Sequence, residues 1–263
     1  MSASNDKWAS GAAYETYMGR WSRKVARLFV EWLGVKREAH WLELGCGTGA
    51  LTGTILELAG PASITAVDPA EPFVAHAQRS ITDPRVSFSV AGVAAIPKRA
   101  EGFDAAVSGL VLNFLPEPER ALAELRERTR PNGVIAAYVW DYSEGMQFLR
   151  RFWDEASEDP RAVELDEGPR FPLCHAPALA QLFRDAGLTG VETTELVVAT
   201  SFENFDDYWQ PFLAGTGPAP SYVASLAPEQ RESLRKNLER RLPVTAQGRI
   251  ELKARAWAVK GQV

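Results

Sequence analysis

The chain is poor in cysteine and lacks long apolar runs. Its 263 residues include only two cysteines, Cys46 and Cys174, so neither a disulfide framework nor a cluster of metal-binding thiolates is expected. No uninterrupted apolar stretch approaches the length that crosses a membrane, and the N-terminus is too polar for a secretory signal. We therefore expect a cytoplasmic protein with reduced thiols, no metal and no membrane span.

An excess of basic residues is also missing. Lysine and arginine number 29 against 34 aspartates and glutamates, which gives a formal net charge of −5 at pH 7. Proteins that coat nucleic acid usually carry a basic surface, so no nucleic-acid partner is expected. Apolar residues make up 46% of the chain, enough for a sizeable core in one large domain or a domain with a cap. Nothing in the sequence indicates an oligomeric state.

A strand, a glycine turn and the start of a helix are expected over residues 40–59. The strand segment 40–44 is short and mostly apolar, as is usual for a central parallel strand. Gly45, Gly47 and Gly49 then allow the backbone to turn sharply and to approach a ligand closely. Apolar residues follow at helical spacing. Such a turn presents unpaired N–H groups and a positive helix terminus to a cofactor.

The cofactor is indicated by Glu43, two positions before the first glycine. The glycine spacing alone also satisfies the dinucleotide fingerprint, so a nucleotide-cofactor oxidoreductase is one alternative. A carboxylate at this place would repel a pyrophosphate, whereas it would pair well with the ammonium of S-adenosylmethionine. A tight turn with a solvated acid and no ligand is a further alternative.

The pattern Glu-x-Gly-x-Gly-x-Gly over residues 43–49 closely resembles motif I of the class I S-adenosylmethionine-dependent methyltransferases. The run FDAAVSGLVLNFLPEPERALAELRERTRPNGVIAAYVW, residues 103–140, is similar to the core of the same family, in its small-molecule branch that includes quinone-ring methyltransferases. The resemblance implies an α/β, doubly wound, mostly parallel seven-stranded sheet with an antiparallel last strand and helical insertions. It also implies S-adenosylmethionine as cofactor and methyl transfer by in-line displacement.

Further residues are assigned to the cofactor site. Asp68 ends the next expected strand about twenty residues beyond the glycines, where a carboxylate can accept both ribose hydroxyls. Val93 stands where the family usually has an aspartate for the adenine amino group, so the backbone near Val93 and Ala94 is expected to serve instead. The predicted cofactor-binding residues are Tyr14, Arg20, Glu43, Gly45, Cys46, Gly47, Gly49, Asp68, Pro69, Val93, Ala94, Ser108 and Gly109.

The N-terminal segment is interpreted as a cap. Residues 1–35 are predicted to form a helical lid, in which Arg20 pairs with the methionine carboxylate and Tyr14 helps to close the pocket. A terminal helix that merely packs on the domain is the alternative. Residues 36–263 are predicted to form the Rossmann-like methyltransferase domain, with helical insertions at about 141–176 and 204–243.

The methyl acceptor is expected to be a small molecule that approaches from the carboxyl ends of the fourth and fifth strands. The predicted acceptor-binding residues are Asn113, Phe114, Trp140, Tyr142, Phe148 and Trp153. His175 is the candidate general base because its ordinary pKa lies near neutrality, although proximity alone can drive this chemistry. Alternatives are a non-catalytic S-adenosylmethionine-binding protein and, within the class, an RNA or protein methyltransferase. The acceptor and the methylated atom (O, N, C or S) are not indicated.

Overall fold

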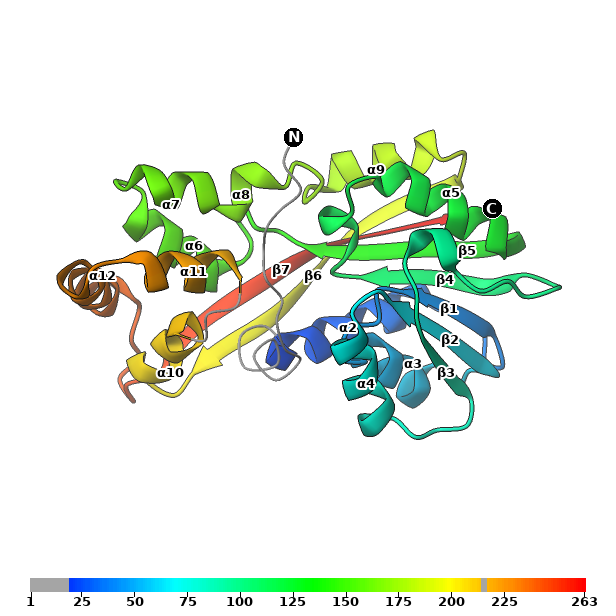
Figure 1. The fold of residues 1–263 in the computed structure, drawn as a ribbon, viewed down its shortest axis with the longest axis horizontal. Helices are drawn as coiled ribbons and strands as arrows, with labels where there is room; N and C mark the ends of the chain where they lie inside the picture. Colours follow the sequence, from blue (N-terminus) through cyan, green and yellow to red (C-terminus); the bar gives the residue numbers. More distant parts are fainter. Residues whose placement is uncertain (1–18, 214–216) are drawn as a thin grey trace. The chain divides into compact units, whose positions relative to one another are not determined.

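A computed structural model describes residues 19–213 and 217–263. The chain forms two compact units. The unit that we call the glycine-turn unit contains residues 22–139, 175–196 and 257–263. The unit that we call the aromatic unit contains the described residues of segments 19–21, 140–174 and 197–256. Each unit is described by itself (Figure 1).

The strands form one seven-stranded sheet in the order β3-β2-β1-β4-β5-β7-β6. The first five strands, which pair in parallel, are β1 (His40–Leu44), β2 (Ser63–Asp68), β3 (Val86–Val90), β4 (Phe103–Gly109) and β5 (Thr129–Trp140). The central strands are buried on both faces, which explains their continuous apolar sequences. Parallel strands end at the same edge, so the residues that follow β1, β2, β3 and β4 lie along one side of the sheet.

The last strand runs in the opposite direction. The Val263 amide donates to the carbonyl of Gly133, and the Asp141 amide donates to the carbonyl of Arg255, so β7 (Ile250–Gln262) is antiparallel to β5. The ion pair between Lys260 and Glu192 fits the same antiparallel register with β6 (Thr189–Phe202). The mostly parallel seven-stranded sheet with an antiparallel last strand, predicted from the sequence, is therefore confirmed.

Strand β5 begins earlier than the sequence suggests. Residues 131–133 read as a turn, with a strand from residue 134 onward. Thr129 already pairs with Phe103, and the register then shifts so that Val134 pairs with Ala105. Asn132 absorbs the irregularity at φ 61°, a conformation that asparagine tolerates better than most residues. The turn signal therefore marks a bulge within the strand rather than its start.

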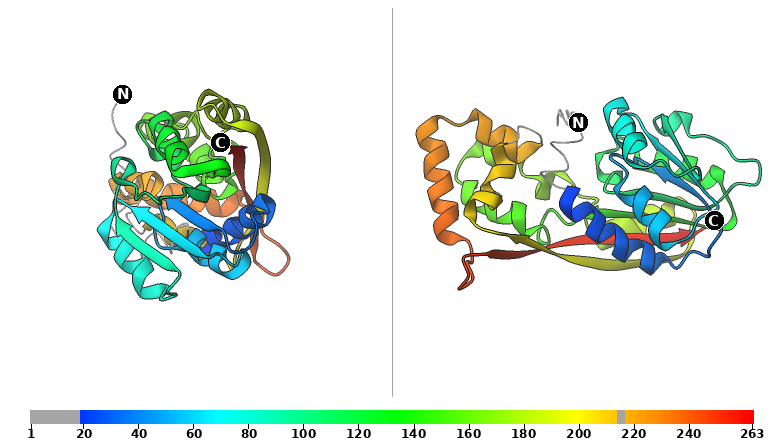
Figure 2. Two further views of the ribbon diagram at one scale, coloured as in Figure 1. Left: turned by 90° about the vertical axis from the view of Figure 1, so that its right-hand side faces the viewer. Right: turned by 90° about the horizontal axis from the view of Figure 1, so that it is seen from below.

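Helices cover both faces of the sheet in the glycine-turn unit (Figures 1 and 2). These helices are α2 (Arg20–Leu33), α3 (Ala50–Leu58), α4 (Glu71–Ser80), α5 (Pro118–Arg128) and α9 (Ala176–Asp185). Local signals position them: Gly49 at φ 90° precedes α3, and Pro118 opens α5. Arg126 and Arg128 then lie near the negative C-terminus of α5.

The aromatic unit is helical around a core of stacked rings. Its helices are α6 (Gln147–Ala156), α7 (Pro160–Leu165), α8 (Glu167–Arg170), α10 (Phe205–Trp209), α11 (Pro218–Ser225) and α12 (Pro228–Arg241). The ring centroids of Phe152 and Phe212 lie 4.4 Å apart, and those of Phe148 and Phe212 lie 4.6 Å apart. These helices fall within the segments predicted as helical insertions. The predicted domain boundaries themselves stay a prediction.

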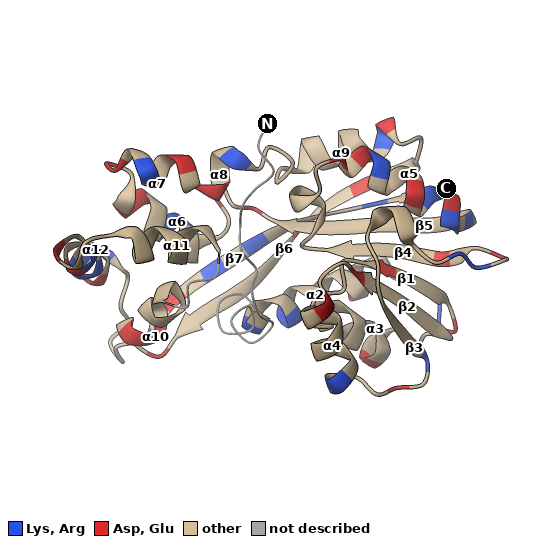
Figure 3. Cartoon of the chain, in the orientation of Figure 1, with Lys and Arg blue, Asp and Glu red and all other residues tan. Residues whose placement is uncertain are grey.

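Charged residues of both signs alternate along the surface helices, as α12 illustrates (Figure 3). Within residues 19–213 and 217–263, every helix is too short or too polar to cross a membrane.

Candidate functional site

The glycine turn joins β1 to α3 through backbone conformations that side chains disfavour. Gly45 lies at φ 78°, Gly47 at φ 52° and Gly49 at φ 90°. The amides of Gly45 and Cys46 both donate to the carbonyl of Val67, at 2.7 and 3.0 Å. The turn is thereby fixed to the end of β2, and the first amides of a helix such as α3 have no acceptor within the helix itself.

Two of the glycines meet different surroundings. A Cβ atom on Gly45 would lie 2.5 Å from Cγ2 of Val111, so the segment after β4 packs directly on this glycine. A Cβ atom on Gly47 would meet no atom of the described residues within 4 Å, so the described part of the chain leaves open space above the middle of the turn. The turn is therefore braced on one side and open on the other. A cofactor could lie in the open space against the backbone.

Asp68 fastens the end of β2 to the turn. Its Oδ2 atom accepts from the Gly47 amide at 2.9 Å, and its Oδ1 atom accepts from the Ala70 amide at 2.9 Å. The side chain is 7% exposed, and burial raises its pKa while these two hydrogen bonds lower it. A carboxylate has about four acceptor positions, so Asp68 retains capacity for two further donors such as ribose hydroxyls.

Glu43 lies beneath the turn as a buried acid. Its side chain is 1% exposed, and the hydroxyl of Thr52 donates to Oε2 at 2.6 Å. Burial raises the pKa of Glu43 to about 8, and the nearby charge of Asp68 contributes in the same direction. The carboxyl is therefore mostly protonated at neutral pH when no cation is close. Thr52 was not predicted as a site residue, although its place in the first turn of α3 marks it.

The remaining predicted cofactor residues lie around the same edge. The Ser108 hydroxyl donates to the carbonyl of Leu44 at 3.0 Å and ties β4 to β1. Burial raises the pKa of the Cys46 thiol, so this cysteine is not a ready nucleophile. Val93 and Ala94 lie in the short η2 helix (Val93–Ala95) that follows β3.

The other two predicted residues of this unit, Pro69 and Gly109, lie at the ends of β2 and β4. The Ala91 amide, at the start of the segment that leads to η2, donates to the Asp68 carbonyl at 3.0 Å. Gly109 ends β4 in close packing, because a Cβ atom there would lie 2.6 Å from Oη of Tyr138. Pro69, directly after Asp68, is exposed. The ends of β1, β2, β3 and β4 thus bring the predicted residues of this unit to one edge of the sheet.

The segment after β4 carries two unusual features. Leu110 lies at φ 63°, a left-handed conformation that costs a non-glycine residue about 1–2 kcal/mol. Asn113, in the short η3 helix (Leu112–Phe114), has both its Oδ1 and Nδ2 atoms buried with no hydrogen-bond partner among the described residues. Leu110 and Val111 were not predicted as site residues, because neither strain nor packing on Gly45 can be seen in the sequence.

Comparison with known proteins agrees with this geometry. The family model described as a methyltransferase domain matches residues 42–137, which span the glycine turn and strands β1 to β5. Residues 42–137 therefore form a methyltransferase domain of the class I S-adenosylmethionine-dependent kind that the glycine turn predicts. The resemblance predicted from motif I is therefore confirmed, and so is the predicted cofactor, S-adenosylmethionine.

Individual relatives of this chain are distant. A malonyl-[acyl-carrier protein] O-methyltransferase of Halalkalibacterium halodurans is 30% identical over 123 residues, 43% of this chain and 45% of the relative. A trans-aconitate 2-methyltransferase of Deinococcus radiodurans is 32% identical over 101 residues, 38% of each chain. The matched segments thus span less than half of these relatives.

Similar solved structures share the fold. Phosphoethanolamine N-methyltransferase 2 of Haemonchus contortus, solved with S-adenosylhomocysteine, aligns with a TM-score of 0.59 and 12% identity over 96% of this chain and 56% of that one. At this identity the likeness is evidence for the fold alone.

The residues of the glycine-turn unit fit S-adenosylmethionine in three respects. Open space lies over Gly47, where an added Cβ atom would meet none of the described residues within 4 Å. Asp68 keeps free acceptor positions beside that turn, because each of its oxygens accepts a single backbone amide from the described part of the chain. Glu43 lies buried beside the turn, where an ammonium would restore its charge. Among the residues that the structure describes, no group of three or more His, Cys, Asp or Glu side chains could hold a metal ion.

Several predicted site residues belong to the aromatic unit. Arg20 donates from Nη1 to Asp207 at 3.0 Å, and its guanidinium lies 4.6 Å from the ring centroid of Phe202. The side chains predicted to bind the acceptor are buried in this unit: Trp140, Tyr142, Phe148 and Trp153. Tyr14 lies outside the described residues. The cofactor and acceptor roles of these residues stay predictions.

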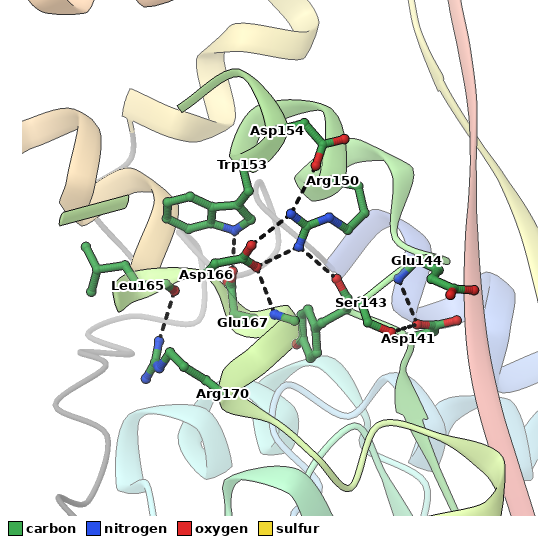
Figure 4. Close-up of polar contacts among 12 residues, drawn as sticks. Asp141, Ser143, Glu144, Arg150, Trp153, Asp154, Leu165, Asp166, Glu167 and Arg170 are labelled. Atoms are coloured by element: carbon green, nitrogen blue, oxygen red, sulfur yellow. Dashed lines mark hydrogen bonds and ion pairs between the residues drawn. The ribbon is translucent and has the colours of Figure 1, made fainter. Parts of the chain in front are cut away.

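A polar network of the aromatic unit was not predicted (Figure 4). Arg150 holds Asp166 through two hydrogen bonds of 2.6 and 2.8 Å, and the indole N–H of Trp153 donates to the buried Glu167. Burial raises the pKa of Glu167 to about 7. His175, the predicted general base, is exposed at the start of α9 in the glycine-turn unit. Its catalytic role stays a prediction.

Proposed function

We propose that the protein transfers a methyl group from S-adenosylmethionine to a small-molecule acceptor by in-line displacement. The observation that carries this proposal is the pairing of Glu43 and Asp68 across a glycine turn with open space at Gly47. A dinucleotide would bring a pyrophosphate to the acidic side chain of Glu43 at this turn. The ammonium of S-adenosylmethionine suits this side chain better.

Each of these residues has a distinct task in the proposed reaction. Glu43 would hold the ammonium of the cofactor, and Asp68 would accept from the ribose hydroxyls. The backbone near Val93 and Ala94, with Pro69, would lie against the adenine. S-adenosylmethionine supplies a methyl carbon already activated by a positive sulfur. The chain therefore needs mainly to bind, orient and exclude water.

The acceptor is proposed from the names of the relatives. Malonyl groups and trans-aconitate both carry carboxylates, so carboxylic acids come first among the acceptors to be tried. A carboxylate is already deprotonated at neutral pH. An acceptor of this kind would need no general base, which would leave His175 without a proton to remove. A phenol or an amine acceptor would restore the need for one.

The proposal is tested with cofactor that carries a labelled methyl group. The protein is incubated with small-molecule extracts of bacterial cells and with a panel of carboxylic acids, and labelled products are identified by mass spectrometry. Calorimetry with S-adenosylhomocysteine and with NAD gives the second measurement. Labelled product and selective binding of S-adenosylhomocysteine support the proposal. Binding without any labelled product would favour a non-catalytic role, and comparable NAD affinity would favour an oxidoreductase.

A further inference from the structure

The side-chain amide of Asn113 is buried without a partner. Both Oδ1 and Nδ2 are shielded from solvent, and neither has a hydrogen-bond partner among the described residues. The observation does not depend on which way the amide is oriented, because both atoms share this condition. Each unsatisfied buried group costs about 1–3 kcal/mol, so a side chain in this state calls for an explanation.

The segment that leads to Asn113 also contains a strained backbone conformation. Leu110, three residues before Asn113, adopts φ 63°, which few non-glycine residues do. Its amide donates to the carbonyl of Tyr138 at 2.7 Å, and the next side chain, Val111, packs against Gly45 of the glycine turn. Packing and hydrogen bonding thus hold the segment in a strained form. Such strain is concentrated at functional sites in proteins.

The position of Asn113 suggests what it binds. The residue follows β4, at the edge of the sheet where ligands of open α/β folds bind. Other polar side chains at this edge already have partners: Ser108 bonds to Leu44, Glu43 to Thr52, and Asp68 to two backbone amides. Of these groups, Asn113 alone has its whole hydrogen-bonding capacity to spare within the described part of the chain.

We propose that Asn113 binds the methyl acceptor and selects its chemical class, an inference that rests on the proposed function. A carboxamide offers a donor and an acceptor side by side, so it is fully satisfied only by a group that offers the complementary pair. A carboxamide, a lactam or a hydroxyl next to a carbonyl presents such a pair. An ionised carboxylate would satisfy only the N–H of Asn113, so a carboxylic acid acceptor, the class proposed above, needs a hydrogen-bond donor beside its carboxylate. The acceptor therefore carries a paired donor and acceptor, whichever atom is methylated.

Three variants test the inference. Asn113→Leu keeps the shape and removes both polar atoms, Asn113→Asp keeps the shape and removes the donor, and Asn237→Leu is a matched control on the surface helix α12. Asn113→Leu should raise the melting temperature of the ligand-free protein by several degrees, because an unmet polar group is gone. Its affinity for S-adenosylhomocysteine should stay within threefold of the parent. Transfer of labelled methyl to a small-molecule extract should fall at least tenfold, and Asn113→Asp should lose transfer as well.

Other results would contradict either the role of Asn113 or the proposed function. A lower melting temperature for Asn113→Leu would mean that the amide has a structural partner, and a tenfold loss of S-adenosylhomocysteine affinity would assign it to the cofactor. Either result overturns the inference, as do undiminished labelling or labelled products that carry no paired donor and acceptor. No labelled product from the parent chain would instead refute the proposed function, and the inference with it.

Discussion

Replacing Glu43 by glutamine should change how the stability of the protein depends on pH. Burial raises the pKa of this carboxyl from 4.5 to about 8 in the folded chain. Between these pH values the folded state holds one proton more than the unfolded state, so the free energy of unfolding falls as pH rises. The stabilising contribution is complete below the unfolded pKa and is lost as pH rises through the folded pKa. The slope is about 1.4 kcal/mol per pH unit for this group alone.

Glu43→Gln removes that titration while it keeps the shape of the side chain. The glutamine oxygen can still accept from the Thr52 hydroxyl, which lies 2.6 Å from Oε2 of Glu43. The stability of the variant relative to the parent should therefore rise by roughly 2–3 kcal/mol between about pH 5.5 and pH 7.5. An unmet amide N–H would lower the stability of the variant by about 1–3 kcal/mol at every pH. The slope is thus the informative quantity.

Chemical denaturation of the parent and of Glu43→Gln at several pH values measures how the difference between their free energies of unfolding changes with pH. Glu167, whose pKa is also raised by burial, titrates in both chains and cancels in the difference. Glu57→Gln, which removes an exposed carboxyl that pairs with Arg27, is the control for the loss of one acidic side chain at the surface. Parallel stability curves for the parent and Glu43→Gln would refute the reasoning, because they would mean that the carboxyl ionises normally in the folded protein.

The same substitution tests the proposed partner of Glu43. An ammonium must be met by the ionised carboxylate, so the parent should bind S-adenosylhomocysteine more tightly as pH rises toward 8. The gain approaches about tenfold per pH unit well below that value. Glu43→Gln should bind weakly and without this pH dependence. Equal affinity in the two chains at pH 8 would remove Glu43 from the cofactor site.

Three further substitutions give independent checks. Asp68→Ala should cost about 2–4 kcal/mol of S-adenosylhomocysteine affinity by calorimetry, and Asp68→Asn less, because one acceptor oxygen survives; unchanged affinity in Asp68→Ala would exclude the ribose role. Gly47→Val should abolish binding in a chain that remains folded by circular dichroism, since the branched side chain would fill open space. Arg20→Ala should lower stability by about 1 kcal/mol, because a half-exposed ion pair with Asp207 and a contact with Phe202 are lost. If Arg20 also holds the methionine carboxylate, as predicted, S-adenosylhomocysteine affinity should fall in that variant too.

The sheet could be predicted because its signals are local. Short apolar strands alternate with helical periodicity from residue 40 to residue 140, and the glycines mark the first turn. Even so, the start of β5 was placed late, since the pairing of Thr129 with Phe103 is a tertiary event that its own sequence does not announce. A turn signal at residues 131–133 describes the bulge correctly without locating the strand end.

The site could be predicted only where chemistry and chain position coincide. Glu43 and Asp68 end adjacent parallel strands, so their proximity follows from the fold. The side-chain contacts around Glu43 and the glycine turn cannot be predicted from the strand order. Thr52 in α3 donates a hydrogen bond to Glu43 in β1, on the other side of the glycine turn. Val111, in the segment after β4, packs against Gly45. The ring stacking of the aromatic unit likewise joins residues far apart in sequence, which is why individual aromatic side chains could not be assigned from sequence alone.

The carboxyl edge of the sheet concentrates features that a fold selected for stability alone would avoid. An acid is buried at Glu43, a leucine is held at φ 63°, and the amide of Asn113 has no hydrogen-bond partner in the described part of the chain. All three lie on or directly after neighbouring strands β1 and β4. An ammonium could pair with Glu43, and paired hydrogen bonds could satisfy Asn113. Ligand binding would then raise the free energy of unfolding and offset part of what these two residues cost the ligand-free protein. Stability and ligand occupancy are therefore expected to be coupled at this edge more strongly than elsewhere in the glycine-turn unit.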